Sequence, residues 1–454
     1  MERTDVYIQI ITEQPLLLLP FVFAVLLYFL VPKIHRLFLS IVLLAPWLQI
    51  GSAQELGAIA VAAKTTSGFA FLLVAFSAWT HPGPKRMLPG VLWIYPVMAL
   101  FWIVAILGVQ DPSTGIILRF QWFFFTISAI SLVSTVVTFA DFKRIINGFT
   151  VGCIVALCIP ISALILFPGE SFLKGVGRFQ PWGTNSNQIG MLFALSAPLL
   201  GYAMITWPKK YKPFLIFMLS LTLGMALLTA SRQTGLAIFM TSFPIIFVLS
   251  KRPIVTILGI AIATIGIGWI MSIGGEIAPM ERMTNLDTGR LQLWYRYITE
   301  VFSEHPLTGL LGTKDGDYFK SPIIGMHPHS AWMNMMYHGG LMLFVPMFSM
   351  VIYSCYSGFR VWRVRKQLVG DPLLYSISFL ILLAMYVQGT FNQVVYWPTY
   401  TWSYLHVVMA SFFICIWFDI RDGDTSFVLR DPEELWDEYE QEELEEFTDY
   451  SVSV

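Results

Sequence analysis

The chain has 454 residues, of which 56% are hydrophobic and only 13% are charged, and its mean hydropathy is +0.67. Soluble domains carry about 25% charged residues, so this composition excludes a soluble protein and indicates an all-α, polytopic membrane protein. The formal net charge of -1 hides an asymmetry, because 14 of the 29 acidic residues follow Phe418.

Apolar segments recur along the chain at about the length of 20 residues that a helix needs to cross a bilayer. The first, 15–31, lacks the cleavage site of a signal peptide. The second, 37–50, is short and the third, 57–79, contains Lys64, so each is either a full span or a re-entrant or broken one. The others lie near 88–108, 115–138, 145–167, 187–207, 213–230, 233–250, 253–273, 330–357, 373–391 and 402–418. We expect 12 or 13 transmembrane helices, with the N-terminus inside for 12 and outside for 13.

Lysine and arginine gather in short loops between alternate segments. Loops of this kind stay in the cytoplasm. They lie at 33–36, 81–87, 141–144, 208–212, 251–252 and 359–366. Residues 1–418 then form the transmembrane domain, and residues 419–454 form an acidic cytoplasmic tail.

A long polar interruption, residues 274–329, is inserted in this domain and is predicted to lie on the side opposite the cytoplasm. Loops of this length are usually functional. The stretch 289–306 has the spacing of a helix, and Thr288 or Asp287 is its predicted cap. We expect its apolar face to lie on the membrane surface or against the bundle. That face consists of Leu291, Trp294, Tyr295 and Ile298.

The predicted outer face carries arginines and lysines on the side that membrane proteins usually keep poor in positive charge. These basic residues suggest a phosphate-bearing ligand, because a guanidinium bonds phosphate oxygens in pairs and keeps its proton. They are Lys174, Arg178, Arg232, Arg282, Arg290, Arg296, Lys314 and Lys320. Arg232 also stands at the predicted start of a helix, whose positive end attracts anions. For Arg232 the alternative is snorkelling, in which the side chain lifts its charge into the lipid headgroups.

Two histidines, His327 and His329, stand at the mouth of the span that follows the loop. Histidine exchanges protons near neutral pH and is therefore a candidate general base. A metal site with Asp315 and Asp317 is the less favoured alternative, because both spacings are common by accident.

Two asparagines precede the helix predicted at 187–207. N-capping is enough to explain Asn185, whereas Asn187 is a candidate for a hydrogen bond to a sugar or phosphate.

Several motifs together resemble the O-antigen ligase and polymerase superfamily of bacterial membrane glycosyltransferases. They are "NSNQIG" (185–190), "TASRQTG" (229–235), "TGR" (288–290), "EHPLTGLLGT" (304–313) and "HPHSAWMNMMYHGGLMLFV" (327–345). Gly339 and Gly340 follow His329 at the spacing of the family, which favours His329 over His327 as the matching histidine. The chain departs from the family pattern at Ser330, where an asparagine is usual.

The resemblance implies an architecture like that of glycosyltransferases that use polyprenyl phosphates (GT-C-like). It also implies a location in the bacterial inner membrane, with the loop 274–329 and the active site facing the periplasm. The glycan donor would be a glycan on undecaprenyl diphosphate, with Arg232 and Arg290 holding the diphosphate and His329 acting as general base. The acceptor would be a second glycan, as in O-antigen or exopolysaccharide polymerisation, or a lipid A-core sugar of lipopolysaccharide, as in ligation. No cofactor, metal ion, nucleotide sugar or nucleic acid is implied.

A transporter or flippase of a lipid-linked or anionic solute is the alternative from a different functional class. Transporters place charged groups inside their spans, as Lys64 and Arg119 are placed here. The other charged groups collect mostly on one predicted face, which favours chemistry at the outer leaflet.

Overall fold

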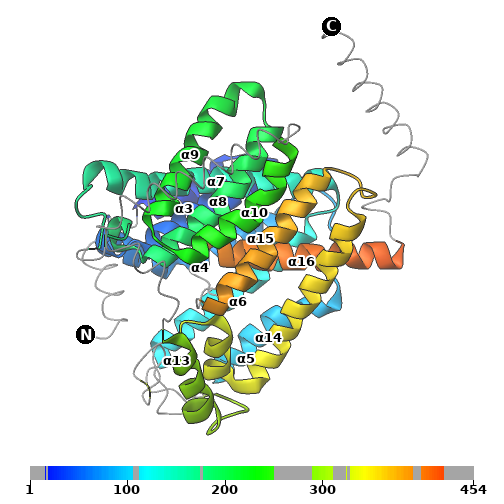
Figure 1. Ribbon diagram of the computed structural model, residues 1–454. Helices are drawn as coiled ribbons and strands as arrows, with labels where there is room; N and C mark the ends of the chain where they lie inside the picture. The colour runs from blue at the N-terminus through cyan, green and yellow to red at the C-terminus, as the bar shows by residue number, and fades with distance from the viewer. Residues whose placement is uncertain are drawn as a thin grey trace.

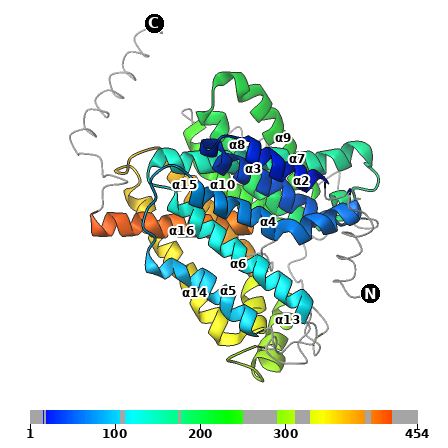
Figure 2. The same ribbon diagram turned by 180° about the vertical axis from the view of Figure 1, so that it is seen from behind.

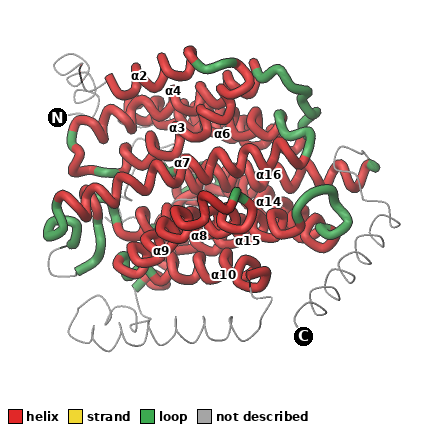
Figure 3. The backbone as a smooth tube through the Cα atoms, turned by 90° about the horizontal axis from the view of Figure 1, so that it is seen from above, coloured by secondary structure: helices red, strands yellow, loops and turns green. Residues whose placement is uncertain are grey.

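The computed structural model describes residue 16 and residues 19–105, 112–173, 177–249, 289–309, 324, 328–391 and 400–423. Within these ranges the regular structure is helical and contains no strand (Figure 3). Eight of the described helices are long and apolar enough to cross a membrane. The prediction of an all-α polytopic membrane protein is therefore confirmed.

The described helices other than α13 coincide with the predicted spans. The thickness of the bilayer sets the length that a spanning helix needs. They are α2 (Leu19–Leu30), α3 (Lys33–Ser52), α4 (Ala58–Thr80), α5 (Ile94–Ala105), α6 (Pro112–Ser134), α7 (Phe139–Leu166), α8 (Ser186–Thr206), α9 (Lys212–Leu228), α10 (Arg232–Leu249), α13 (Arg290–Arg296), α14 (Ala331–Val364), α15 (Pro372–Phe391) and α16 (Thr401–Asp422). The segment 37–50 belongs to the 20-residue α3, and α4 continues unbroken past Lys64, so neither is broken as considered from the sequence. The predicted span 253–273 lies outside the described residues.

Helices α8 and α16 form the centre of the bundle. They are buried over 83% and 78% of their spans, whereas the span that contains α9 is buried over only 28%. Helix α8 packs against α7, α9 and α10, and α16 packs against α14 and α6 (Figure 1). Seen from behind, α5 packs against both α6 and α14 (Figure 2).

Loops rich in lysine and arginine meet at one end of the bundle, called here the basic end. Arg86 pairs with Asp419 near the end of α16, and its backbone N–H donates to the Ser134 carbonyl over 2.8 Å. Trp207 Nε1, at the end of α8, donates to Asn147 Oδ1 over 3.0 Å. The described basic loops therefore share one end, as the predicted topology requires. That this end faces the cytoplasm stays a prediction.

The opposite, distal end carries the starts of α8, α10 and α14 and the end of α15. Asn185 caps α8, as predicted, by accepting the Asn187 N–H over 2.9 Å. Ser330 caps α14 by accepting the Met333 N–H over 3.5 Å. Gly289, with φ of 66°, directly precedes the first turn of α13. The predicted caps Thr288 and Asp287 lie outside the described residues.

The loop helix buries a different face from the predicted one. Leu293 and Tyr297 are buried with Ile324 and Tyr337, whereas Leu291 and Tyr295 are 77% and 69% exposed. The chain widens into a π-helical turn at Tyr297–Phe302, so the spacing of 3.6 residues per turn does not hold there. Leu291 and Tyr295 therefore do not pack against the bundle, and the alternative, that this face lies on the membrane surface, stays a prediction.

Candidate functional site

Arg232 is the first residue of α10. The Ser231 hydroxyl caps this helix by accepting the Thr234 N–H over 3.4 Å, and Ala230 turns the chain with φ of 48°. A Cβ atom on Gly190 of α8 would lie only 2.0 Å from Thr234 Oγ1, so the glycine permits the close contact of α8 with the start of α10. Arg232 is thus carried by a helix start that packs directly on the centre of the bundle.

Arg290 is the first residue of α13 and reaches the end of α15. Its Nη1 donates to the Phe391 carbonyl over 3.0 Å, and Gln233 Nε2 donates to the same carbonyl over 3.1 Å. The last carbonyls of a helix have no partner within the helix, so this one is available to both. Burial, and then the charge of Arg232, lower the pKa of Arg290 from its ordinary value. The two guanidinium groups therefore lie within electrostatic range of each other.

His329 lies just before α14 in a strained conformation. Its φ of 49° falls in the left-handed region, which a non-glycine residue adopts at a cost of about 1–3 kcal/mol. The surrounding contacts hold it there, because Trp294 Nε1 donates to the Pro328 carbonyl over 2.9 Å and Ser330 caps the next helix. Burial, and then the charge of Arg290, lower the pKa of the imidazole below 6.5.

The structure therefore brings Arg232, Arg290 and His329 together at the distal end, although three separate elements carry them. Figure 1 shows α13 beside the start of α14. The charge of Arg232 contributes to the lowered pKa of Arg290, and the charge of Arg290 contributes to the lowered pKa of His329. Two fixed positive charges beside a base that stays neutral near pH 7 are able to bind an anion and accept a proton. His327 lies outside the described residues.

Arg178 and Asn187, the other residues predicted to contact substrate, bind each other. Arg178 Nη2 donates to Asn187 Oδ1 over 3.0 Å, and its Nε donates to the Thr229 carbonyl over 2.9 Å. These bonds tie the start of α8 to the turn that carries Arg232. Both residues thereby gain a structural role, and their direct contact with substrate stays a prediction.

Helix α14 is interrupted at Gly340, where Gly309 of the loop packs closely against it. Gly340 has φ of 54° and ψ of -152°, and a Cβ atom there would lie 2.4 Å from the Leu307 carbonyl. At this interruption two backbone N–H groups do not donate within the helix. Instead, the N–H groups of Leu341 and Met342 donate to the carbonyls of Pro306 and Leu307 over 2.8 and 3.1 Å. The "HPLTG" stretch is therefore fixed, backbone to backbone, on the helix that follows His329.

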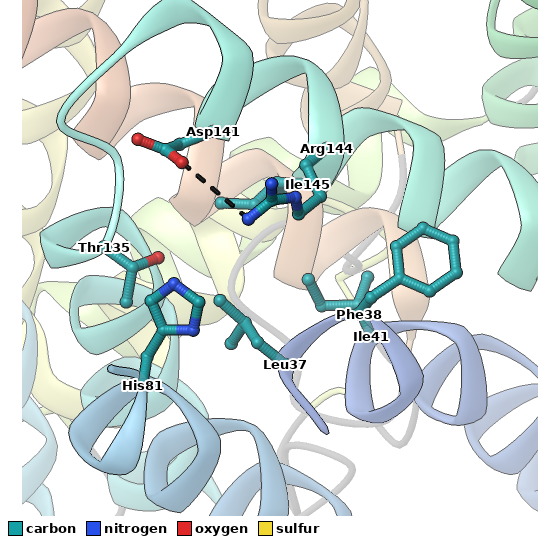
Figure 4. A pocket seen from close by; sticks show the side chains of 8 residues that line it. All are labelled: Leu37, Phe38, Ile41, His81, Thr135, Asp141, Arg144 and Ile145. Carbon is teal, nitrogen blue, oxygen red and sulfur yellow. Dashed lines mark ion pairs between the residues drawn. The ribbon is translucent and has the colours of Figure 1, made fainter. Parts of the chain in front are cut away.

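A separate pocket lies at the basic end, away from these residues (Figure 4). Its lining consists of Leu37, Phe38, Ile41, His81, Thr135, Asp141, Arg144 and Ile145. Asp141 completes a capping box with Thr138 at the start of α7 and lies 4.0 Å from Arg144. Burial, and then the charge of Arg144, lower the pKa of His81. Because the pocket is mostly apolar and its carboxylate is used as a helix cap, it explains none of the predicted chemistry.

Sequence reasoning missed the residues that hold the candidate site in place. Gln233, Trp294 and Phe391 connect α10, α13 and α15, and Trp332 Nε1 adds a bond to Thr390 Oγ1 over 3.2 Å. The only sequence feature that pointed to any of them is the position of Gln233 directly after Arg232. The bonds of Arg290 and Trp294 end on backbone carbonyls, which no sequence pattern marks.

Comparisons with known proteins give no family for the chain. No family model matches it, and no protein of curated function is significantly similar to it.

Proposed function

We propose that this protein is a membrane glycosyltransferase that moves a glycan from undecaprenyl diphosphate to a sugar hydroxyl at the outer leaflet. The observation that carries the proposal is the convergence of Arg232, Arg290 and His329. The motif resemblance supports the same assignment. In this proposal the distal end faces the periplasm, and the reaction belongs to O-antigen or exopolysaccharide synthesis.

The proposed reaction is a single displacement at the anomeric carbon. The acceptor oxygen forms a bond to that carbon, the bond to the phosphate oxygen breaks, and its electron pair leaves with the diphosphate. Arg232 and Arg290 stabilise this growing negative charge, and the removal of one such group typically costs about 2.7–4 kcal/mol in barrier. His329 takes the proton of the hydroxyl, a contribution of about 10²–10⁴-fold. Direct displacement inverts the anomeric centre.

Three substitutions test the proposal in purified protein or in a deletion strain. His329→Ala should abolish transfer while the protein still inserts and binds the glycan donor, and Arg232→Ala and Arg290→Ala should each weaken donor binding or turnover. Arg296→Ala is the matched control, because Arg296 is exposed and pairs with Glu300 over 2.7 Å. Unchanged surface polysaccharide in all three site variants would remove the glycosyltransferase proposal.

Polymerisation and ligation differ in the acceptor and share the glycan donor. We favour polymerisation slightly, with ligation to lipid A-core as the alternative. Deletion of the gene separates the two. Loss of polysaccharide chain length is the result expected of a polymerase, and loss of attachment to the lipid core is the result expected of a ligase.

One buried charge favours a transporter as a second candidate. Arg119 of α6 is 2% exposed, and its Cζ atom lies 3.9 Å from the ring centroid of Trp102, which in turn contacts His338. Charged groups within spans often mark transport pathways. Movement of undecaprenyl diphosphate across proteoliposomes, retained in His329→Ala and lost in Arg119→Met, would support transport over transfer.

A further inference from the structure

The Phe391 carbonyl joins the two arginine-bearing helices of the candidate site. It accepts Nη1 of Arg290 from α13 and Nε2 of Gln233 from α10. Both donor side chains are half-buried. One backbone oxygen at the end of α15 therefore sets how α10 and α13 lie relative to each other.

Gln233 is held by α15 on two sides. Its side chain donates to Phe391, and its backbone carbonyl accepts from Nε2 of the buried Gln388 over 3.5 Å. The Phe391 carbonyl can only accept a hydrogen bond, so the amide of Gln233 turns its Nε2 atom, and not Oε1, toward Phe391. Because Arg232 directly precedes Gln233, these bonds also fix the backbone from which the Arg232 guanidinium extends.

The two guanidinium groups repel each other, and this repulsion grows as they approach. Arg290 is restrained by the shared carbonyl, and Gln233 restrains the start of α10 against the same oxygen. A diphosphate needs both cations at a set spacing, one for each phosphate. A single phosphate is satisfied by one guanidinium, which already matches its oxygens in pairs.

We propose that Gln233 is a specificity-determining positioning residue that holds Arg232 and Arg290 at the spacing of a diphosphate, so that the pair selects diphosphate over monophosphate. This inference rests on the proposed function and assigns a role within the same site. It predicts that the loss of the Gln233 side-chain bond loosens the spacing while each arginine keeps its charge.

The experiment compares the affinities of the full-length protein in nanodiscs for inorganic pyrophosphate and inorganic phosphate, measured by calorimetry. In Gln233→Ala the preference for pyrophosphate should fall by about 2–10-fold, the size of effect of one hydrogen bond, while phosphate affinity stays within about twofold. Gln233→Met, which keeps the length of the side chain without its hydrogen bonds, should behave in the same way. Gln292→Ala is the matched control, because Gln292 is exposed on α13.

The outcomes separate this inference from the proposed function. An unchanged preference in both Gln233 variants, with pyrophosphate binding lost in Arg232→Ala, overturns the role of Gln233 and leaves the proposed function in place. An equal loss of both ligands in the Gln233 variants, with unaltered melting temperature, also overturns selectivity. Failure of the unaltered protein to prefer pyrophosphate contradicts the diphosphate site itself and removes both proposals.

Discussion

The charge of Arg290 acts on the imidazole of His329, although the two residues lie far apart in the sequence of the large loop. Burial is the larger cause and Arg290 the second cause of a pKa below 6.5 for His329. The neutral imidazole is the form that accepts a proton. A base with a lowered pKa keeps this form to lower pH, so the site is arranged to keep His329 ready at neutral pH.

This relationship predicts the acid limb of the pH profile. For the unaltered protein, kcat/KM of glycan transfer should fall with decreasing pH through a value below 6.5, since protonation removes the base. In Arg290→Gln the limb should move to higher pH, toward 6.5, because one of the two causes of the lowered pKa is gone. The measurement is residual transfer against pH. Arg296→Gln should leave the acid limb at the same pH as in the unaltered protein. If Arg290→Gln also leaves the limb unchanged, the result would count against His329 as the base.

Trp294→Phe should slow transfer by about 2–10-fold, the equivalent of one hydrogen bond of about 0.5–1.5 kcal/mol. The variant loses the bond from Nε1 to the Pro328 carbonyl, which helps to hold His329 in its strained conformation. It keeps an aromatic ring against Phe391. The fall should appear in kcat, with little change in melting temperature. An equal fall in stability and activity would mean that Trp294 serves the fold and not the position of His329.

Gly340→Ala should destabilise the protein by more than about 1–3 kcal/mol, the usual cost of a residue in a glycine-only conformation. The added methyl group also meets the Leu307 carbonyl at 2.4 Å. Thermal unfolding in detergent measures the effect. Gly235→Ala in α10 is the matched control, because a Cβ atom there meets nothing within 4 Å and alanine favours helix. Equal melting temperatures for the two variants would show that the break in α14 is not needed.

Ser330→Ala should cost about 0.5–2 kcal/mol, because the cap of α14 is lost. Ser330→Asn should restore most of this stability, since asparagine caps helices as well as serine does. The same pair of variants tests the departure from the family motif. If the residue acts only as a cap, transfer by Ser330→Asn should match that of the unaltered protein. A large gain in kcat would assign a chemical role to the amide.

Much of the fold was predictable because the bilayer imposes a length and an apolar composition on each span. Helix α7 begins earlier than its apolar run, at Phe139, because Thr138 and Asp141 form a capping box that extends the helix into polar sequence. The buried side of the loop helix, in contrast, was not predicted from its own sequence. Its buried residues Leu293 and Tyr297 are selected by contact with Tyr337, which lies far away in the sequence.

The sequence alone determined that the chain crosses a membrane many times, and it singled out Arg232, Arg290 and His329 by residue type and motif. The length of an apolar segment and the Lys and Arg content of a loop are properties of contiguous residues, so they can be read from the sequence. Only the tertiary structure decided that these three residues meet, that Arg178 binds Asn187, and that the Phe391 carbonyl joins two helices. Those relationships depend on backbone groups and on how distant helices pack, and neither leaves a periodic trace in the sequence.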